Sequence, residues 1–272
     1  MPYQLIAFDL DGTLLDSAKR IRPESLAAIE KAAAAGKTVV LATGRCIPEL
    51  SAYLEQLKNV KYTICISGAA VFETASGVPV FSKEIEPELV EELLRRSEGE
   101  NVMVHLLSRR SIVEKGFECH MADYNMGVYQ EMFDRLTEKP EDLRRFYREQ
   151  HPVVNKLNFY CRTYAQRSRL EERLSNLPLT HCYAETHSLE FTPPGVSKGS
   201  ALQLLCDRLG VPLEQSIAVG DAEIDLDILR TAGLGIAMGN AFEIVKQTAK
   251  VTVRSNDEDG CAQAIGEYLL KE

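Results

Sequence analysis

Four acidic side chains stand where apolar stretches of the sequence end, and their types suit a bound divalent cation. Asp9 and Asp11 directly follow the apolar run Gln4–Phe8. Asp221 and Asp225 follow a similar run far along the chain. Crowded carboxylates repel one another and raise each other's pKa unless a cation neutralises them. Because oxygen ligands without His or Cys favour a hard ion, the four residues predict a Mg²⁺ site.

Small, hydroxyl-bearing and basic residues in similar positions predict that phosphate binds beside this cation. Gly12 and Gly44 permit close backbone approach, and N–H groups exposed there can bind anionic oxygens. Thr43 and Ser67 follow two further apolar runs. Lys198 adds a positive charge at the start of a predicted helix, whose N-terminus itself favours anions.

The spacing of the first two acids suits phosphoryl transfer. A carboxylate can attack phosphorus once a metal screens the repulsion between the two anions, which gives an aspartyl-phosphate. A second acid two residues later can protonate the leaving oxygen and afterwards deprotonate water. We expect Asp9 to be the nucleophile and Asp11 the general acid and base. The sequence lacks a G-x-S-x-G motif and a P-loop, and no G-x-G-x-x-G turn follows the first predicted strand. Motifs of other catalytic mechanisms are therefore absent.

Each of these residues also has a plainer explanation. The sequence D-x-D-G-T can form a simple turn, and Thr43-Gly44 alone is typical of turns. Lys198 alone is most often a solvated lysine, and the acidic run from Asp221 to Asp227 is most often the start of a solvated helix. An EF-hand is excluded, since Arg20 stands where that loop needs Glu.

The elements that must position these residues alternate between strand and helix at both ends of the chain. Apolar runs predict strands at 4–8, 38–42, 62–66, 216–219, 234–237 and 251–253. Amphipathic segments predict helices at 24–35, 47–58, 198–209, 225–232, 241–248 and 259–270. Ser197 is expected to cap the third of these helices, and Gly210 to end it. This alternation is typical of a parallel sheet with crossover helices, whose ligands bind at the carboxyl ends of the strands.

In the middle of the chain the predicted strands and helices follow a different order. After a predicted hairpin around Ser76-Gly77, residues 84–190 mix charged helices with paired strands, among them His181–Glu185 with Ser188–Thr192. The first order resumes after Pro193-Pro194-Gly195. We therefore predict an α/β fold in which a doubly wound, Rossmann-like parallel-sheet core, residues 1–83 and 191–272, is interrupted by a smaller α+β domain, residues 84–190.

Composition excludes several classes of protein. The chain of 272 residues is 45% hydrophobic, which excludes a disordered chain, and its net charge of −9 argues against nucleic-acid or acidic-membrane partners. No uncharged run reaches the roughly 18 residues that span a bilayer. Seven cysteines without a C-x-x-C pair predict reduced thiols and a cytoplasmic location. The oligomeric state cannot be predicted from the sequence.

Four motifs in order resemble the haloacid dehalogenase superfamily of phosphotransferases. The motifs are AFDLDGTLLDS (7–17), LATGR (41–45), PPGVSKGSAL (193–202) and AVGDAEIDLDIL (218–229). Their order and spacing are most similar to the Cof-type branch, which carries a large α/β cap of the C2B kind. The resemblance covers nearly the whole chain.

The resemblance implies a role for each matching residue. Asp9 would be the nucleophile and Asp11 the acid and base, while Thr43 would hydrogen-bond the phosphoryl group and Lys198 would balance its charge. Mg²⁺ would be held by Asp9, the backbone carbonyl of Asp11, and Asp221, with Asp225 in support. The cap would exclude water and select the substrate.

Two positions depart from the pattern of this branch. Ser67 stands where the branch usually has Asn, and Ile224 stands where Asn usually precedes the last Asp. An Asn side chain both donates and accepts hydrogen bonds, whereas Ile does neither. The nucleophile, acid, lysine and metal-binding Asp remain, so we expect these departures to change rate or substrate.

The sequence favours a Mg²⁺-dependent phosphatase that hydrolyses small phosphomonoesters, such as sugar phosphates, through an aspartyl-phosphate. One alternative is a sugar phosphomutase of the same fold, which would return the phosphoryl group to the sugar. A second alternative, motivated by Ser67 and Ile224, is a non-catalytic protein that binds phosphorylated metabolites.

Overall fold

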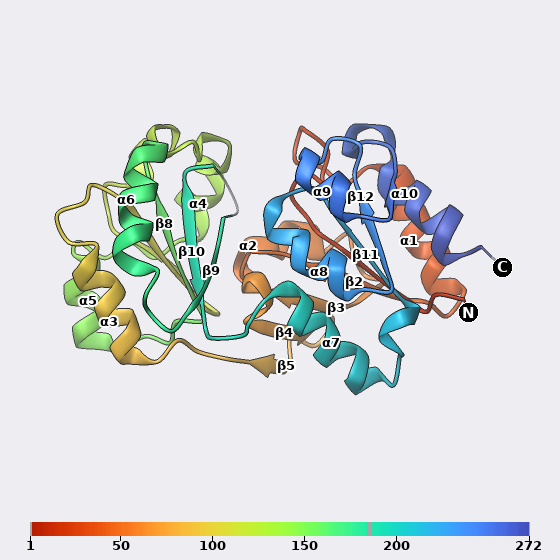
Figure 1. The fold of residues 1–272 in the computed structure, drawn as a ribbon, viewed down its shortest axis with the longest axis horizontal. Helices are drawn as coiled ribbons and strands as arrows, with labels where there is room; N and C mark the ends of the chain where they lie inside the picture. Colours follow the sequence, from red (N-terminus) through yellow and green to blue (C-terminus); the bar gives the residue numbers. More distant parts are fainter. Residues whose placement is uncertain (1, 184–185, 272) are drawn as a thin grey trace. The chain divides into compact units, whose positions relative to one another are not determined.

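The computed structural model describes residues 2–183 and 186–271. Tertiary contacts divide the chain into two compact units (Figure 1). The core unit comprises Met1–Gly44, Ser51–Ser82 and Val196–Glu272, and the inserted unit comprises Arg45–Leu50 and Lys83–Gly195.

The core unit is built on one eight-stranded sheet, in the order β13-β12-β11-β1-β2-β3-β4-β5. All neighbours are parallel except the hairpin at one edge, where β3, β4 and β5 run antiparallel. The strands are β1 (Leu5–Phe8), β2 (Thr38–Ala42), β3 (Val60–Cys65), β4 (Ala70–Glu73), β5 (Pro79–Ser82), β11 (Ser216–Gly220), β12 (Leu234–Ala237) and β13 (Val251–Thr252).

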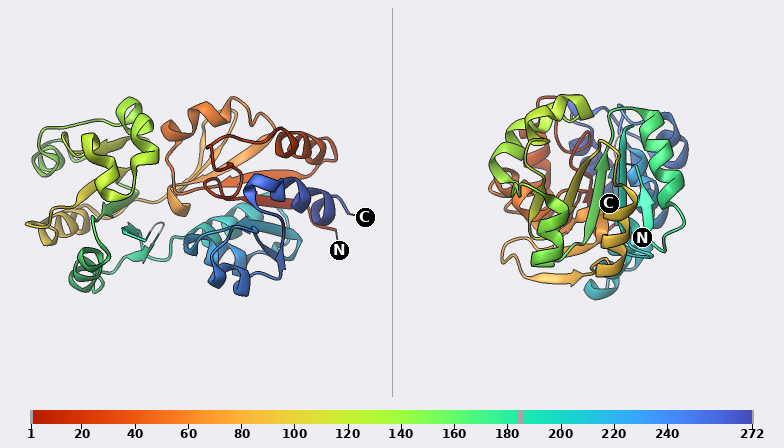
Figure 2. Two further views of the ribbon diagram at one scale, coloured as in Figure 1. Left: turned by 90° about the horizontal axis from the view of Figure 1, so that it is seen from above. Right: turned by 90° about the vertical axis from the view of Figure 1, so that its left-hand side faces the viewer.

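Helices pack on both sides of this sheet, as a doubly wound fold requires. On one side α1 packs with α10, and on the other α7 packs with α8 and α8 with α9 (Figure 2). The helices are α1 (Pro23–Ala34), α7 (Lys198–Leu209), α8 (Leu226–Thr231), α9 (Glu243–Thr248) and α10 (Gly260–Ala264), and α2 (Ile47–Leu54) contributes residues to both units. The predicted α/β class is confirmed.

The start and end of α7 show how local sequence sets an element that carries a candidate site residue. The Ser197 hydroxyl accepts a hydrogen bond from the Ser200 N–H, and the Ser200 hydroxyl accepts one from the Ser197 N–H. This reciprocal cap satisfies N–H groups that a helix start leaves without partners. Gly210 ends the helix with a left-handed φ of 65°. Lys198 is consequently the first residue of the helix.

The inserted unit is built on a five-stranded antiparallel sheet, in the order β7-β6-β8-β10-β9. Its strands are β6 (Met103–Leu107), β7 (Ser111–Val113), β8 (Lys156–Tyr160), β9 (Thr180–Cys182) and β10 (Ser188–Thr192). Its helices are α3 (Pro87–Arg96), α4 (Gln130–Leu136), α5 (Leu143–Gln150) and α6 (Tyr164–Leu174).

The two faces of the inserted sheet differ in chemistry because side chains alternate along each strand. One face carries residues such as Leu157, Phe159 and Phe191, which join apolar side chains of α3, α5 and α6 in a buried core. The other face carries polar residues, and Met103 and Tyr160 at its margin pack with Phe133 of α4. The alternation makes an apolar face and a polar face in one sheet.

Several element ends differ from the sequence-based expectation. Helix α2 ends at Leu54 rather than at residue 58, because the Gln56 N–H bonds the Tyr53 carbonyl in a tighter i to i+3 turn. The predicted C-terminal helix is split, since α10 continues as a π-helical turn, Ile265–Leu269. Helix α4 was not predicted, and positions 184–185 of the predicted strand His181–Glu185 lie outside the described residues.

The cysteines are all free thiols. The buried ones are Cys46, Cys65, Cys161, Cys206 and Cys261. Throughout residues 2–183 and 186–271, no helix combines the length and the apolar character that crossing a bilayer requires.

A glycine beside the start of α7 provides a stability test. Gly68 has a φ of +99°, and a Cβ added there would lie 2.0 Å from the Ser197 carbonyl oxygen. We expect Gly68→Ala to lower the free energy of unfolding by about 3 kcal/mol or more, since backbone strain and a backbone clash add together.

Gly77 is the matched control, because it also has a positive φ, of +64°, but nothing lies within 4 Å of an added Cβ. Gly77→Ala should cost only about 1 kcal/mol, the price of a left-handed alanine. Urea unfolding of both variants measures the difference, and equal losses would contradict the close-approach explanation.

Candidate active site

Four neighbouring parallel strands direct their following residues to one edge of the core sheet. Strands β11, β1, β2 and β3 lie side by side and run in the same direction. Asp221 follows β11, Asp9 follows β1, Thr43 follows β2 and Ser67 lies in the turn after β3. The carboxyl ends of parallel strands meet at one edge, which is the usual ligand-binding edge of such a sheet.

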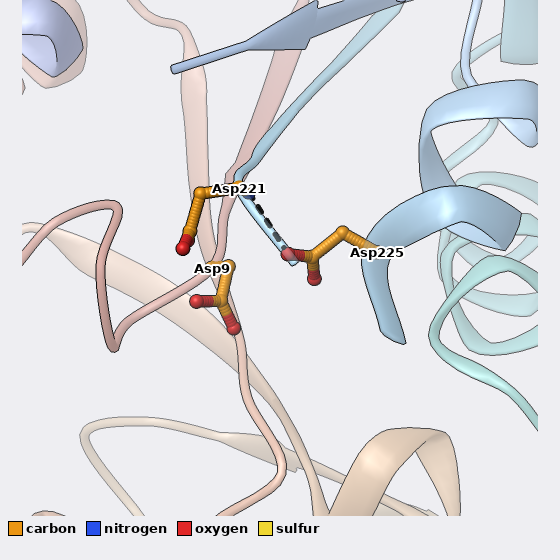
Figure 3. Close-up of side chains that lie close together, drawn as sticks. All are labelled: Asp9, Asp221 and Asp225. Atoms are coloured by element: carbon orange, nitrogen blue, oxygen red, sulfur yellow. Dashed lines mark hydrogen bonds between the residues drawn. The ribbon is translucent and has the colours of Figure 1, made fainter. Parts of the chain in front are cut away.

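Three carboxylates converge at this edge. One oxygen from each of Asp9, Asp221 and Asp225 lies within 4.8 Å of the other two (Figure 3). Asp9 is 8% exposed and Asp225 is fully buried, so two of the three are removed from water. Buried carboxylates in such proximity are unfavourable unless cations compensate their charge.

Lys198 supplies one of the compensating charges. Its Nζ donates a hydrogen bond to Asp9 Oδ1 at 2.5 Å and another to Asp225 Oδ1 at 2.7 Å. The lysine itself is only 2% exposed. Because Lys198 opens α7 and the two aspartates follow β1 and β11, this pair of contacts joins three separate parts of the core unit.

Asp225 holds the loop that follows β11 in place. Its Oδ2 accepts hydrogen bonds from the backbone N–H groups of Asp221 and Ala222, both at 3.1 Å, while its Oδ1 accepts from Lys198. Gly220 leaves room for this carboxyl group, since a Cβ there would lie 2.5 Å from the Asp225 Cβ. Asp225 therefore anchors both Lys198 and the backbone of Asp221.

The shifted pKa values show that the carboxylates carry more negative charge than Lys198 can balance. Burial, together with the charges of Asp225 and Asp221, raises the pKa of Asp9 well above its usual value, although Lys198 opposes the shift. Burial and the charge of Asp225 raise the pKa of Asp221 to about 7. Burial alone would lower the pKa of Lys198, but the charges of Asp225 and Asp9 raise it. The lysine thus stays protonated, while the carboxyl groups of Asp9 and Asp221 retain protons more readily than usual.

The loop after β1 approaches Asp221 closely. Gly12 has a φ of +83°, and a Cβ there would lie 2.3 Å from Asp221 Oδ2, so no larger residue fits without movement. The next residue, Thr13, donates its hydroxyl hydrogen to Asp221 Oδ1 at 2.6 Å. Asn240 donates from Nδ2 to the Gly12 carbonyl oxygen at 2.8 Å, which fixes the same loop from the other side.

Asp11 lies apart from the three converging carboxylates. Its Oδ1 accepts a hydrogen bond from Lys19 Nζ at 2.8 Å, and both side chains are about a quarter exposed, at 26% and 28%. An acid that is partly exposed and paired with its own cation can exchange protons with groups outside the protein. Its environment differs from that of buried Asp9.

The remaining predicted phosphate-binding residues lie at the ends of β2 and β3. The Ser67 N–H bonds the Thr43 carbonyl oxygen at 3.0 Å, which brings these two residues together. Ser67 adopts a left-handed φ of 54° and is 3% exposed. Gly44 follows Thr43 directly and is half-buried. Ile224 is half-buried in the 3-10 turn Glu223–Asp225.

The donor set at this edge fits a hard divalent cation. The converging groups are all carboxylates, and one lysine cannot neutralise three of them. The raised pKa values of Asp9 and Asp221 indicate that a further positive charge would be favourable there. Because both oxygens of Asp225 already accept hydrogen bonds, its charge and its hold on Lys198 are its main contributions to such a site.

Sequence reasoning missed three residues that contact the predicted ones. Asn240 follows β12, so the rule that directs attention to strand ends would have found it if applied to that strand. Thr13 lies within the D-x-D-G-T motif, but its hydroxyl partner depends on the fold. Lys19 carries no signal in the sequence that links it to Asp11.

The polar face of the inserted sheet carries a second group of buried polar side chains. Ser111 donates its hydroxyl hydrogen to Glu49 Oε1 at 2.8 Å and lies 2.7 Å from His105 Nε2. A serine hydroxyl that donates to the carboxylate must accept from the histidine, so His105 carries its proton on Nε2. Lys156 pairs with Glu190 on the same face at 3.1 Å, and all of these side chains are buried.

Two hydrogen-bond acceptors on this face have no partner within the described part of the chain. They are His105 Nδ1 and Asn158 Oδ1, which stand opposite each other on β6 and β8. The sequence could have indicated this face, because polar and apolar residues alternate along β8 and β10. Sequence analysis did not identify this group.

Comparison with known proteins finds relatives over nearly the full length. Residues 6–265 match the haloacid dehalogenase-like hydrolase family. The 5-amino-6-(5-phospho-D-ribitylamino)uracil phosphatase YitU of Bacillus subtilis is 31% identical, over 98% of each chain. An HMP-PP phosphatase of Yersinia pseudotuberculosis is 30% identical, over 90% of this chain and 87% of its own.

A solved structure is similar in fold as well as in sequence. It is that of a haloacid dehalogenase-like hydrolase from B. subtilis, with a TM-score of 0.88 and 26% identity, and it covers 97% of this chain and 99% of its own.

The raised pKa of Asp221, about 7, predicts how cation binding depends on pH. A cation must displace the proton that this carboxyl group holds below its pKa, so affinity for Mg²⁺ should rise as the pH is raised towards 7 and level off above it. The rise should approach about tenfold per pH unit for each proton released. Titration calorimetry in buffers of different ionisation enthalpy measures both the affinity and the protons released.

Asp221→Asn should weaken this binding and flatten its pH dependence, because the asparagine holds no titrating proton. Asp207→Asn, on the exposed side of α7, is the control and should leave both unchanged. Affinity for Mg²⁺ that does not change with pH would contradict the expected competition with protons.

Buried His105 predicts a pH dependence of stability. Burial, aided by the charge of Lys156, lowers its pKa to about 3, whereas an unfolded histidine has a pKa of about 6.5. Between these values the unfolded chain binds a proton that the folded chain does not. The free energy of unfolding should therefore fall as the pH drops through this range, by roughly 1 kcal/mol per pH unit.

His105→Gln keeps an N–H donor for Ser111 but cannot titrate, so its stability should depend less on pH. His120→Gln, at an exposed position, should behave like the wild type. Urea unfolding across the range compares the three proteins. If His105→Gln and the wild type lost stability equally with falling pH, another group would be responsible.

Proposed function

Because the chain belongs to the haloacid dehalogenase-like hydrolases, in their Cof-type branch with a C2B cap, we propose that it is a Mg²⁺-dependent phosphatase of small phosphomonoesters. The observation that carries this proposal is the buried contact of Lys198 with Asp9 and Asp225 beside Asp221. It combines a nucleophile, a fixed positive charge and a cation-binding carboxylate at one strand edge.

Asp9 is the nucleophile in this proposal. Its backbone is fixed, since its N–H bonds the Val219 carbonyl oxygen at 2.9 Å, and its Oδ1 is held by Lys198. The carboxylate oxygen attacks phosphorus and the bond from phosphorus to the leaving oxygen breaks, which gives an aspartyl-phosphate and an alcohol. Lys198 remains protonated and balances charge on the phosphoryl group.

Asp11 is the general acid and base in this proposal. It gives a proton to the leaving oxygen as the first bond breaks, and it takes a proton from water as water attacks the aspartyl-phosphate. The second step releases inorganic phosphate and restores Asp9. The partial exposure of Asp11 suits this exchange better than the burial of Asp9 would.

Mg²⁺ would be held by Asp9, Asp221 and the backbone carbonyl of Asp11, with Asp225 in support, and would screen the repulsion between carboxylate and phosphate. Thr43, Gly44 and Ser67, with Gly12, are assigned to the phosphoryl oxygens. This assignment is supported by the positions of these residues, which lie at the ends of neighbouring strands and after β1.

For the substrate we propose a phosphorylated metabolite of sugar or sugar-alcohol type. One relative is named for a phosphorylated ribitylaminouracil, which carries its phosphate on such a chain. We assign substrate selection to side chains of the inserted unit.

The test is phosphate release from a panel of sugar phosphates, sugar-alcohol phosphates and p-nitrophenyl phosphate, with Mg²⁺ or with a chelator. We expect turnover that depends on Mg²⁺ and that falls at least about 10³-fold in Asp9→Asn, because the nucleophile is lost. Asp207→Asn changes an exposed aspartate of the same unit and should keep full activity.

The alternatives give different results in the same assay. A phosphomutase would release little phosphate and would be activated by a sugar bisphosphate. A binding protein would be stabilised against heat by a ligand without releasing phosphate. Turnover that survives Asp9→Asn would overturn the proposed mechanism.

A further inference from the structure

A tight turn after the first strand of the core unit, residues 16–20, is built around one aspartate. The backbone N–H groups of Ala18 and Arg20 both bond Asp16 Oδ1 at 2.9 Å. The Asp16 N–H bonds the Arg20 carbonyl oxygen, and the Lys19 N–H bonds the Asp16 carbonyl oxygen, each at 2.9 Å. The turn therefore has a single well-determined backbone conformation.

Lys19 occupies an unusual backbone conformation in this turn. Its φ is +58°, in the left-handed region that Gly, Asn and Asp adopt far more readily than Lys. A residue held in such a conformation stores strain that the surrounding contacts must offset, and such residues gather at functional sites.

Contacts from other parts of the core unit hold the turn in place. Tyr53 donates its hydroxyl hydrogen to the Lys19 carbonyl oxygen at 3.2 Å. Asp257 accepts from the Ser17 N–H at 2.8 Å and from the Ser17 hydroxyl at 2.6 Å. Since these partners come from segments far away in the sequence, the position of Lys19 is set by the tertiary structure.

The side chain that this turn presents reaches Asp11. Lys19 Nζ donates to Asp11 Oδ1 at 2.8 Å. Both side chains are about three-quarters buried, so water screens this contact only in part. The contacts that hold this turn therefore also set the position of the Asp11 carboxyl group.

We propose that Lys19 is a positioning residue for the acid–base group of this protein. It holds Asp11 Oδ1 and thereby fixes the carboxyl group, which gives its proton as the leaving bond breaks and accepts one from water afterwards. Lys19 keeps its own protons throughout and acts only through Asp11. This inference rests on the proposed phosphatase function.

The leaving group of the substrate separates this role from a merely structural one. An alkyl phosphate has a poor leaving group that needs a proton, whereas p-nitrophenyl phosphate has a good one that does not. The ratio kcat/KM reports the steps up to loss of the leaving group. Misplacing the acid should therefore lower kcat/KM for the alkyl ester much more than for the nitrophenyl ester.

The experiment compares Lys19→Gln with the wild type on p-nitrophenyl phosphate and on the alkyl phosphate that the wild type hydrolyses fastest. We expect kcat/KM to fall about 10²-fold for the alkyl phosphate and to change little for p-nitrophenyl phosphate. Lys19→Arg keeps a cation and a donor, so it should restore a large part of the lost activity. KM for the nitrophenyl ester should stay near the wild-type value.

Arg20→Gln is the matched control, because it removes a positive charge from the neighbouring, exposed residue, whose partner is Asp16 and not Asp11. It should leave both substrates at wild-type rates. Equal losses for the two substrates in Lys19→Gln, or no loss for either, would overturn the inference. A wild type that hydrolyses no phosphomonoester would instead overturn the proposed function, so the two failures are distinguishable.

Discussion

The candidate site depends on one buried ammonium group that two carboxylates share. Lys198 is 2% exposed and bonds Asp9 and Asp225, which stand 189 and 27 residues away from it in the sequence. Removing one partner of a buried ion pair typically costs about 3–5 kcal/mol, because the other charge is left in a poorly solvated place. The start of α7, the loop after β1 and the loop after β11 are consequently held in one arrangement.

This constraint also explains why the site suits phosphate and a cation together. The lysine fixes one oxygen of Asp9 and stays charged, while Asp221 and Asp9 have raised pKa values that show unbalanced negative charge. A divalent cation would relieve that imbalance, and an anionic phosphoryl group could then approach the protonated lysine. Around this centre the close approaches of Gly12 and Gly68 bring neighbouring backbone segments together where a side chain would not fit.

The different roles proposed for the aspartates follow from their different surroundings. Asp9 is buried and held by Lys198, which suits a nucleophile that must keep one geometry. Asp11, two residues later, is partly exposed and held by Lys19 from a strained turn. Asp225 is fully buried, and both of its oxygens accept hydrogen bonds, so it holds Lys198 and the backbone after β11 in place. The three aspartates thus differ in burial and partners, as the different roles proposed for them require.

The sequence by itself determined the α/β class, the order of the elements and the edge where the acids gather, because strand periodicity and parallel crossovers leave little freedom in where strands end. It also placed Ser197 and Gly210 at the ends of α7, since capping depends on local backbone chemistry. Only the tertiary structure decided which oxygen each cation holds. Lys198, Thr13 and Lys19 find their partners through loop conformations set by distant contacts, such as Tyr53 on Lys19 and Asn240 on Gly12. The sequence likewise did not determine which polar side chains of the inserted sheet pair with each other. Periodicity shows which face of a strand a residue lies on, but it does not show which strand lies beside it.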